Sequence, residues 1–239
     1  MKNLFSLRTS KIPGLTSRLI ASSILLACMG AAQAEDLVIV VPEGAQKPEA
    51  LSGQMVEWKA KLGTDNVIWV DSLKREKPSG FASMAVLGFS NDTHRAAWRK
   101  AHAGKLNGSL QVSDVDTLVE GGVAPPASSK PVYKISYYKL LSSREAFQAW
   151  VDGYLGKYLE AQLEHKILTR YAMYLERGEG GRLLLVLEYP DVETEQGAEP
   201  IKEGLSEKIA RTDAEYVRQL DLKESLRTTQ SWTLAVPAR

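Results

Sequence analysis

Apolar positions along this chain fall into short strand-like runs and longer helical stripes, and the first half contains both kinds. The strand-like runs are rich in β-branched residues and stop at turn residues such as Pro42 and Gly80. Between the first two runs, apolar side chains recur every three or four residues from Leu51 to Leu62, which is the spacing of one helix face. The pattern predicts the order βαββαβ, with strands at 37–41, 67–70, 81–89 and 110–119 and helices at 51–62 and from Asn91 or Asp92 to about Lys105.

The second half repeats this order and carries the strongest helical stripe of the chain. Apolar residues from Phe147 to Leu159 follow a period of 3.6 over three turns. Ser142 or Ser143 is expected to cap that helix, because a serine hydroxyl accepts hydrogen bonds from the free N–H groups of a first turn. The glycines between Arg177 and Arg182 suit a hairpin. Strands are predicted at 132–141, 167–175, 182–189 and 229–236, with a further helical pattern that reaches about Arg227.

The stretch that separates the halves consists of small residues and proline, which sustain neither a helix nor a central strand. Each half would form a four-stranded antiparallel sheet with both helices on one face, so the other face lies open. Pressing the two open faces together in one chain predicts an α+β fold that closes as a pseudo-twofold α/β barrel, a monomer rather than a homodimer. The expected divisions are a leader at 1–34, a first unit at 35–122, a linker at 123–131 and a second unit at 132–239.

The N-terminus has the organisation of a secretory signal peptide. A basic stretch ends at Arg18, an apolar run follows from Leu19 to Ala32, and Ala32-Gln33-Ala34 forms a small-residue cleavage site. The apolar run is shorter than the roughly 20 residues of a transmembrane helix, and no later segment reaches that length. We therefore expect an exported protein of the bacterial periplasm, without a membrane span.

A second interpretation of the leader stays open. Leu25-Leu26-Ala27-Cys28 is similar to a lipobox, in which Cys28 would be lipidated and would anchor an outer-membrane-type lipoprotein. Cys28 is the only cysteine of the chain, so both interpretations exclude an intrachain disulfide.

The charge of the mature chain argues against polyanionic partners. Removing the four positive charges of the leader leaves 26 basic residues against 29 acidic ones, a net charge of −3. The mature chain contains no basic block, so neither nucleic acid nor an anionic membrane is an expected partner. A small-molecule ligand and a partner protein both stay open.

In topology and pattern, nearly the whole mature chain resembles the dimeric α/β-barrel superfamily. This superfamily includes stress-responsive barrel proteins, antibiotic-biosynthesis-type monooxygenases and chlorite dismutase-like proteins. The resemblance implies a ligand pocket between the two sheets, and for its oxidoreductase branches a reaction that is cofactor-free or uses haem. The haem-degrading members also use a first-strand asparagine, which the run at 37–41 lacks.

Alternation along the strands predicts which side chains line such a pocket. Tyr133 and Tyr137 belong to the more apolar set of their strand and are expected to face the helices, which turns Ser136 inward. A cavity of this kind suits a small aromatic or acidic ligand, whereas the competing interpretation is an ion-pair network or a solvated strand end. The candidate ligand-binding residues are Lys134, Tyr138, Arg170, Tyr174 and Glu188.

Histidines offer alternative chemistry. His94, Trp98 and His102 lie four residues apart on one helix face, but the two histidines are then roughly 12 Å apart and cannot share a metal ion. Trp98 is expected in the core. By the resemblance, His102 would approach the pocket and His165 would occupy the place of a haem ligand. The position of His165 at a helix end also suits a hydrogen-bond donor to the last carbonyls.

Three functions follow from these observations. No complete catalytic constellation is present, which favours an exported protein that binds a small ligand between the sheets and needs no cofactor or metal. The first alternative is a monooxygenase-like oxidoreductase, cofactor-free or with haem. The second is a structural or interaction module without a ligand.

Overall fold

The computed structural model describes residues 35–42, 67–75, 81–89, 91–102, 111–123, 129–178 and 181–238. Within them the strands are β1 (Glu35–Pro42), β2 (Val67–Arg75), β3 (Phe81–Phe89), β4 (Gln111–Gly122), β5 (Val132–Leu140), β6 (Arg170–Glu176), β7 (Arg182–Tyr189) and β8 (Arg227–Pro237). The helices are α2 (Asp92–His102), α3 (Arg144–Trp150), α4 (Gly156–Glu164), α5 (Val192–Ala210), α6 (Ala214–Leu220) and α7 (Lys223–Leu226), with a π-helix, η2 (Val151–Leu155), between α3 and α4. The leader, the helix predicted at 51–62 and most of the linker lie outside the described residues.

All eight strands pair antiparallel in one curled sheet that closes on itself. Its order is β1-β3-β2-β8-β5-β7-β6-β4, and the closure comes from the pairing of β4 with both β1 and β6. Two seams join the halves of the chain, one between β2 and β8 and the other between β4 and β6. The chain therefore has a mixed α+β fold whose sheet is continuous across both halves.

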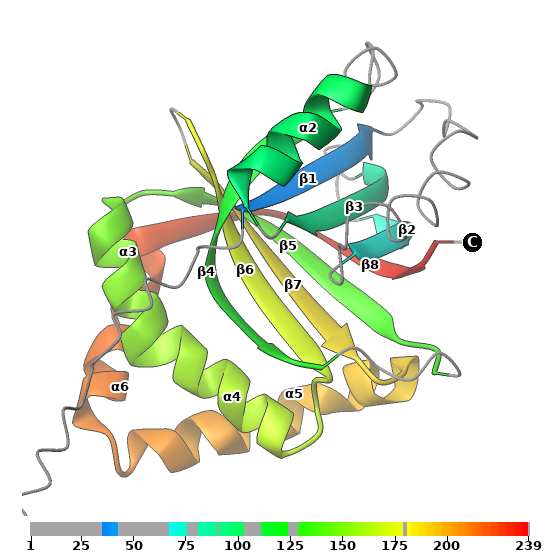
Figure 1. Cartoon of the computed structure of the whole chain (residues 1–239). Helices are drawn as coiled ribbons and strands as arrows, with labels where there is room; N and C mark the ends of the chain where they lie inside the picture. The colour runs from blue at the N-terminus through cyan, green and yellow to red at the C-terminus, as the bar shows by residue number, and fades with distance from the viewer. Residues whose placement is uncertain are drawn as a thin grey trace, which may run out of the picture. The chain divides into compact units, whose positions relative to one another are not determined.

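Helices cover the outer side of this sheet. Helix α2 packs on β1 and β3, α4 packs on β4, and α5 packs on β7. Figure 1 shows α3, α4, α5 and α6 gathered on one side of the strands β5, β6 and β7. Side-chain caps mark the start of α3 and α5. The Ser143 hydroxyl accepts from the Ala146 N–H at 3.2 Å, and the Asp191 carboxylate accepts from the Thr194 N–H at 2.7 Å.

Two separate apolar cores result, one on each side of the second-half strands. The inner core lies inside the barrel and contains Tyr133, Ile135 and Tyr137 from β5. The outer core lies between the sheet and the helices and contains Tyr138 together with Trp150. Both faces of β5 are consequently buried.

The long helix after β5 departs from the regular α-helix that its stripe predicts. At η2 the Gly156 N–H donates to the Val151 carbonyl, one residue further back than in an α-helix. Gly153 lies in this turn against Gln219 of α6, and a Cβ at that position would come within 2.9 Å of the Gln219 Cγ. The π turn lets α6 approach closely, a contact that no local pattern encodes.

Candidate functional site

The inner faces of β6 and β7 meet in cross-strand layers that carry a charged pair at each end. The outermost layers are ion pairs, and the two layers between them are apolar or aromatic and buried. From one end to the other the layers are Arg170–Glu188, Ala172–Val186, Tyr174–Leu184 and Glu176–Arg182.

Glu188 is the most deeply buried of these charges, with 1% of its side chain exposed. Arg170 donates to one carboxylate oxygen through Nε at 3.2 Å and Nη2 at 2.8 Å, and the Thr169 hydroxyl donates to the other at 2.6 Å. Burial raises the pKa of Tyr133, and the charge of Glu188 raises it further, so this phenol stays protonated and donates to the carboxylate. Burial alone would lower the pKa of Arg170, but Glu188 raises it above the usual value. The carboxylate is thus satisfied by protein donors.

The faces predicted for Lys134 and Tyr138 are wrong. Tyr138 lies in the outer core, and Lys134 reaches outward to Glu195 of α5, with 3.8 Å between Nζ and Oε1. Tyr133 and Tyr137 occupy the barrel interior in their place. Because both faces of β5 are buried, alternation of apolar residues carries no information about which face is inside.

Arg170, Tyr174 and Glu188 do share the inner side of the sheet, so the structure brings together three of the five predicted ligand-binding residues. Tyr137 lies near the opposite end, where its hydroxyl points at the Met84 sulfur, 3.7 Å away, and the Arg182 guanidinium lies 5.5 Å from its ring centroid.

The alternative functional residues lie apart from this interior. Trp98 is buried in the contact of α2 with the sheet, and its ring centroid is 6.0 Å from that of Phe89. His165 is exposed at the end of α4, where Nδ1 is 2.9 Å from the Ala161 carbonyl oxygen. A haem ligand needs a pocket that covers the porphyrin, so the exposed His165 does not fit that role. His102 is the last residue of α2.

A pocket that the sequence did not predict opens on the outer side of the sheet. It has a volume of about 530 Å³, which is within the usual range for a small-molecule site. Its lining is partly apolar and partly charged. The lining residues are Asp116, Leu140, Ser142, Arg144, Leu175, Glu176, Arg177, Gly178 and Gly181.

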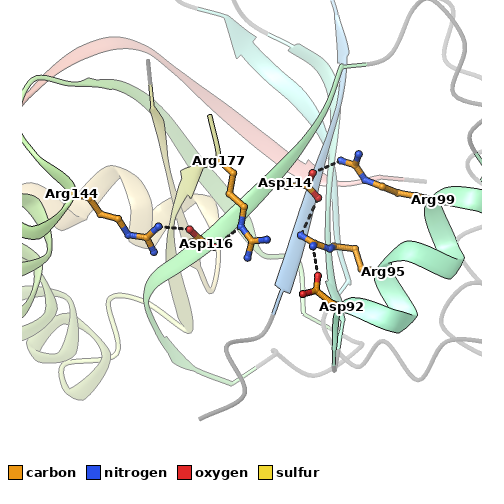
Figure 2. A network of polar contacts seen from close by, with 7 residues as sticks. All are labelled: Asp92, Arg95, Arg99, Asp114, Asp116, Arg144 and Arg177. Atoms are coloured by element: carbon orange, nitrogen blue, oxygen red, sulfur yellow. Dashed lines mark hydrogen bonds and ion pairs between the residues drawn. The ribbon is translucent and has the colours of Figure 1, made fainter. Parts of the chain in front are cut away.

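Asp116 is the centre of the charged wall. Arg144, at the start of α3, donates to one of its oxygens at 2.5 Å, and Arg177, just after β6, donates to the other through Nε at 2.6 Å. Figure 2 shows these two arginines converging on Asp116 from opposite sides. Two residues back on the same face of β4, Asp114 binds Arg95 and Arg99 of α2. Side chains at i and i+2 of a strand share a face, which explains the continuous network.

The two arginines at this wall favour the charged form of Asp116. Burial raises the pKa of Asp116, but the hydrogen bonds and charges of Arg177 and Arg144 outweigh it and hold the pKa below the usual value. Glu176 is already paired with Arg182 through contacts of 2.6 and 2.9 Å. Arg144 contacts Asp116 through a single terminal nitrogen. A guanidinium has five N–H donors, so Arg144 has donors left for a ligand.

Sequence reasoning had one signal for this site. Asp114 and Asp116 alternate along a predicted strand, and charges on one face of a strand require partners when that face packs against helices. The identity of those partners depends on contacts between residues 28 and 61 positions apart in the chain.

The fold of this chain can be compared with those of known proteins. No protein-family model and no curated protein matches this sequence. Among solved structures, an anthrone oxidase-like protein aligns with a TM-score of 0.56 and 6% identity, over 87% of this chain and 92% of its own. At this identity the match shows a shared fold alone.

Two further neighbours have lower TM-scores. One is an uncharacterized ferredoxin-fold protein from Listeria monocytogenes related to antibiotic biosynthesis monooxygenases, with a TM-score of 0.47 and 8% identity over 87% of this chain and 96% of its own. The other is a mutant chlorite dismutase from Candidatus Nitrospira defluvii, with a TM-score of 0.42 and 11% identity over 87% of this chain and 92% of its own.

No cluster of three or more His, Cys, Asp or Glu side chains in the described ranges is arranged to hold a metal ion. No helix in the same ranges is long and apolar enough to cross a bilayer.

Proposed function

We propose that this protein is exported and binds a small ligand with a carboxylate or phosphate group in the pocket between Asp116, Arg144 and Arg177. The observation that carries the proposal is the convergence of two guanidinium groups on one carboxylate at the wall of a 530 Å³ pocket. Arginine is the side chain best suited to planar, bidentate recognition of such anions. The site lies outside the barrel, not between the sheets as alternation suggested.

Apolar and charged lining have separate roles in this proposal. Leu140 and Leu175 would contact the body of the ligand, while Arg144 binds its anionic group in the plane of the guanidinium. Asp116 keeps both arginines in place before the ligand arrives, so little side-chain entropy is lost on binding. Arg177 acts from the other side of Asp116 and completes the positive wall.

The decisive experiment is calorimetric titration with a panel of small anions that includes benzoate, succinate and inorganic phosphate. We expect at least one to bind with a Kd of about 0.1–1 mM or tighter, and Arg144→Met to weaken it by at least about tenfold. Arg144→Lys keeps the positive charge but loses the planar guanidinium group. Its affinity should lie between those of the wild type and Arg144→Met. Arg218→Met is the matched control, because Arg218 is an exposed arginine paired on α6 with Glu215. Equal binding by wild type and Arg144→Met would rule out this pocket.

Export has its own support and test. β1 begins at Glu35, immediately after the Ala32-Gln33-Ala34 site, so cleavage there would leave the whole strand intact. Mass spectrometry of protein from a periplasmic fraction should find Glu35 as the first residue. A lipidated Cys28 at the N-terminus would instead identify the lipoprotein, and an intact Met1 in the cytoplasm would contradict export.

The tandem arrangement is also part of the proposal. The sheet order β4-β1-β3-β2 of the first half corresponds position by position to β8-β5-β7-β6 of the second, as two βαββαβ units related by a pseudo-twofold axis require. Since the sheet closes within one chain, we expect a monomer. Sedimentation equilibrium should give a single-chain mass, and a tight dimer would contradict the arrangement.

An oxidoreductase of the monooxygenase type is the second candidate. It is favoured by the three tyrosines Tyr133, Tyr137 and Tyr174 buried in the barrel interior, and by the fold shared with an anthrone oxidase-like protein. Oxygen consumption with anthrone as the probe tests it. A rate that Tyr174→Phe removes but Arg144→Met does not would favour this candidate over ligand binding alone.

A further inference from the structure

Arg227, the first residue of β8, is a buried cation whose contacts are aromatic. Only 7% of the residue is exposed, and it lies opposite Leu140 of β5, on the side of the sheet that faces α3. Its guanidinium carbon is 3.7 Å from the ring centroid of Tyr138 and 5.3 Å from that of Trp150. Within the described part of the chain, no carboxylate forms an ion pair with it.

Two hydrogen-bond donors in this cluster have no acceptor in the described residues. They are the Nε of Arg227 and the Nε1 of Trp150, and both atoms are buried. Each group can only donate, so neither can satisfy the other. Buried N–H groups in native proteins nearly always find an acceptor, and an unmatched buried positive charge is costlier still. The cluster therefore has two donors and one positive charge in excess.

The chemistry of the donors indicates which acceptor the cluster would take. Aromatic rings beside the guanidinium leave its N–H groups as the polar part available to a ligand, and those N–H groups bind planar oxyanions side-on. Burial raises the pKa of Tyr154, whereas the Arg227 charge acts in the opposite direction, so that charge is felt across the outer core. The Asp116 carboxylate is already bound by Arg144 and Arg177, so it is not the acceptor for Arg227. A neutral water would supply an acceptor but no charge.

We propose that Arg227 and Trp150 form a binding site for a small planar oxyanion, such as formate, nitrate or bicarbonate, or the carboxylate of a small metabolite. The Arg227 guanidinium binds the anion, and the Trp150 indole donates a second hydrogen bond. Because the site uses neither Arg144 nor Arg177, it is separate from the pocket of the proposed function and holds or fails independently of it.

Tryptophan fluorescence measures the binding, since the anion would lie beside the Trp150 indole. Sodium formate replaces sodium chloride at constant ionic strength, up to about 50 mM, which saturates a site with a Kd of about 1 mM. The wild type should show a saturable change. Trp150→Phe should remove the fluorescence change, and isothermal calorimetry on that variant should show weakened binding. Trp232→Phe is the matched control, because Trp232 contacts Lys134 instead, and it should leave the titration intact.

Variants of the arginine decide the outcome. Arg227→Met removes an uncompensated buried charge, so it should fold and should weaken formate binding by at least about tenfold. Arg227→Lys keeps the positive charge without the planar guanidinium group. Its affinity for formate should lie between those of the wild type and Arg227→Met. The absence of a saturable response in the wild type, or an identical Kd in wild type and Arg227→Met, would overturn the proposal.

Discussion

Replacing Glu188 by Gln tests whether charge holds the buried pair at the end of the barrel interior. Gln keeps the shape of Glu188 and can still accept from the Thr169 hydroxyl, but it leaves the Arg170 guanidinium beside a neutral amide. Removing one member of a buried ion pair costs about 3–5 kcal/mol. Arg170 retains 17% exposure, so water offsets part of the loss and we expect about 3 kcal/mol, the lower end of that range. In a domain of this size, that loss lowers Tm by about 6–12 °C.

The double variant Arg170→Met/Glu188→Gln isolates the charge. With the guanidinium removed, no buried cation is left unpaired, and the double variant should be more stable than Glu188→Gln alone. Urea unfolding followed by tryptophan fluorescence gives the free energy of unfolding of each variant. A loss below about 1 kcal/mol for Glu188→Gln, or a double variant no more stable than the single one, would refute the reasoning.

Three further predictions concern Asp116, Gly122 with Gly204 as its control, and Trp98. The pKa of Asp116 is lowered in the folded protein, so its stabilisation is complete above the unfolded value of about 3.9 and is lost as the pH falls through the lower folded value. Asp116→Asn should therefore cost stability at about pH 6 but little at about pH 2, which urea midpoints across that range would check. Gly122 has φ +87° and a Cβ there would lie 2.2 Å from the Thr169 carbonyl oxygen, so Gly122→Ala should cost about 1–3 kcal/mol in thermal unfolding. Gly204→Ala is its control, because that helical glycine has open space around it and the change should add about 0.5–1 kcal/mol. Trp98→Ala should cost about 3–5 kcal/mol by chemical denaturation, and a cost as small as that of a surface change would contradict its place in the core.

Among the described residues, the sequence by itself determined the order of the strands and the limits of some of them. Strands β3 and β7 have the bounds that the pattern predicts, and Ser143 caps α3 as expected. These features depend on residues within a few positions of one another, so the pattern that encodes them is local. The charged layer of Arg170 and Glu188 also follows from alternation, because the face that these two residues share has charged positions only at the ends of both strands.

Only the tertiary structure decided which face of β5 is inside and which arginines Asp116 meets. Tyr137 and Tyr138 are equally buried, each with 8% exposure, so hydrophobicity cannot tell the barrel interior from the helix layer. The contacts of Asp116 with Arg144 and Arg177 depend on the register of β4 against β6 and on the position where α3 begins. Register and packing are set by the sum of many long-range contacts, and a change of one residue would move every side chain of a strand to its other face.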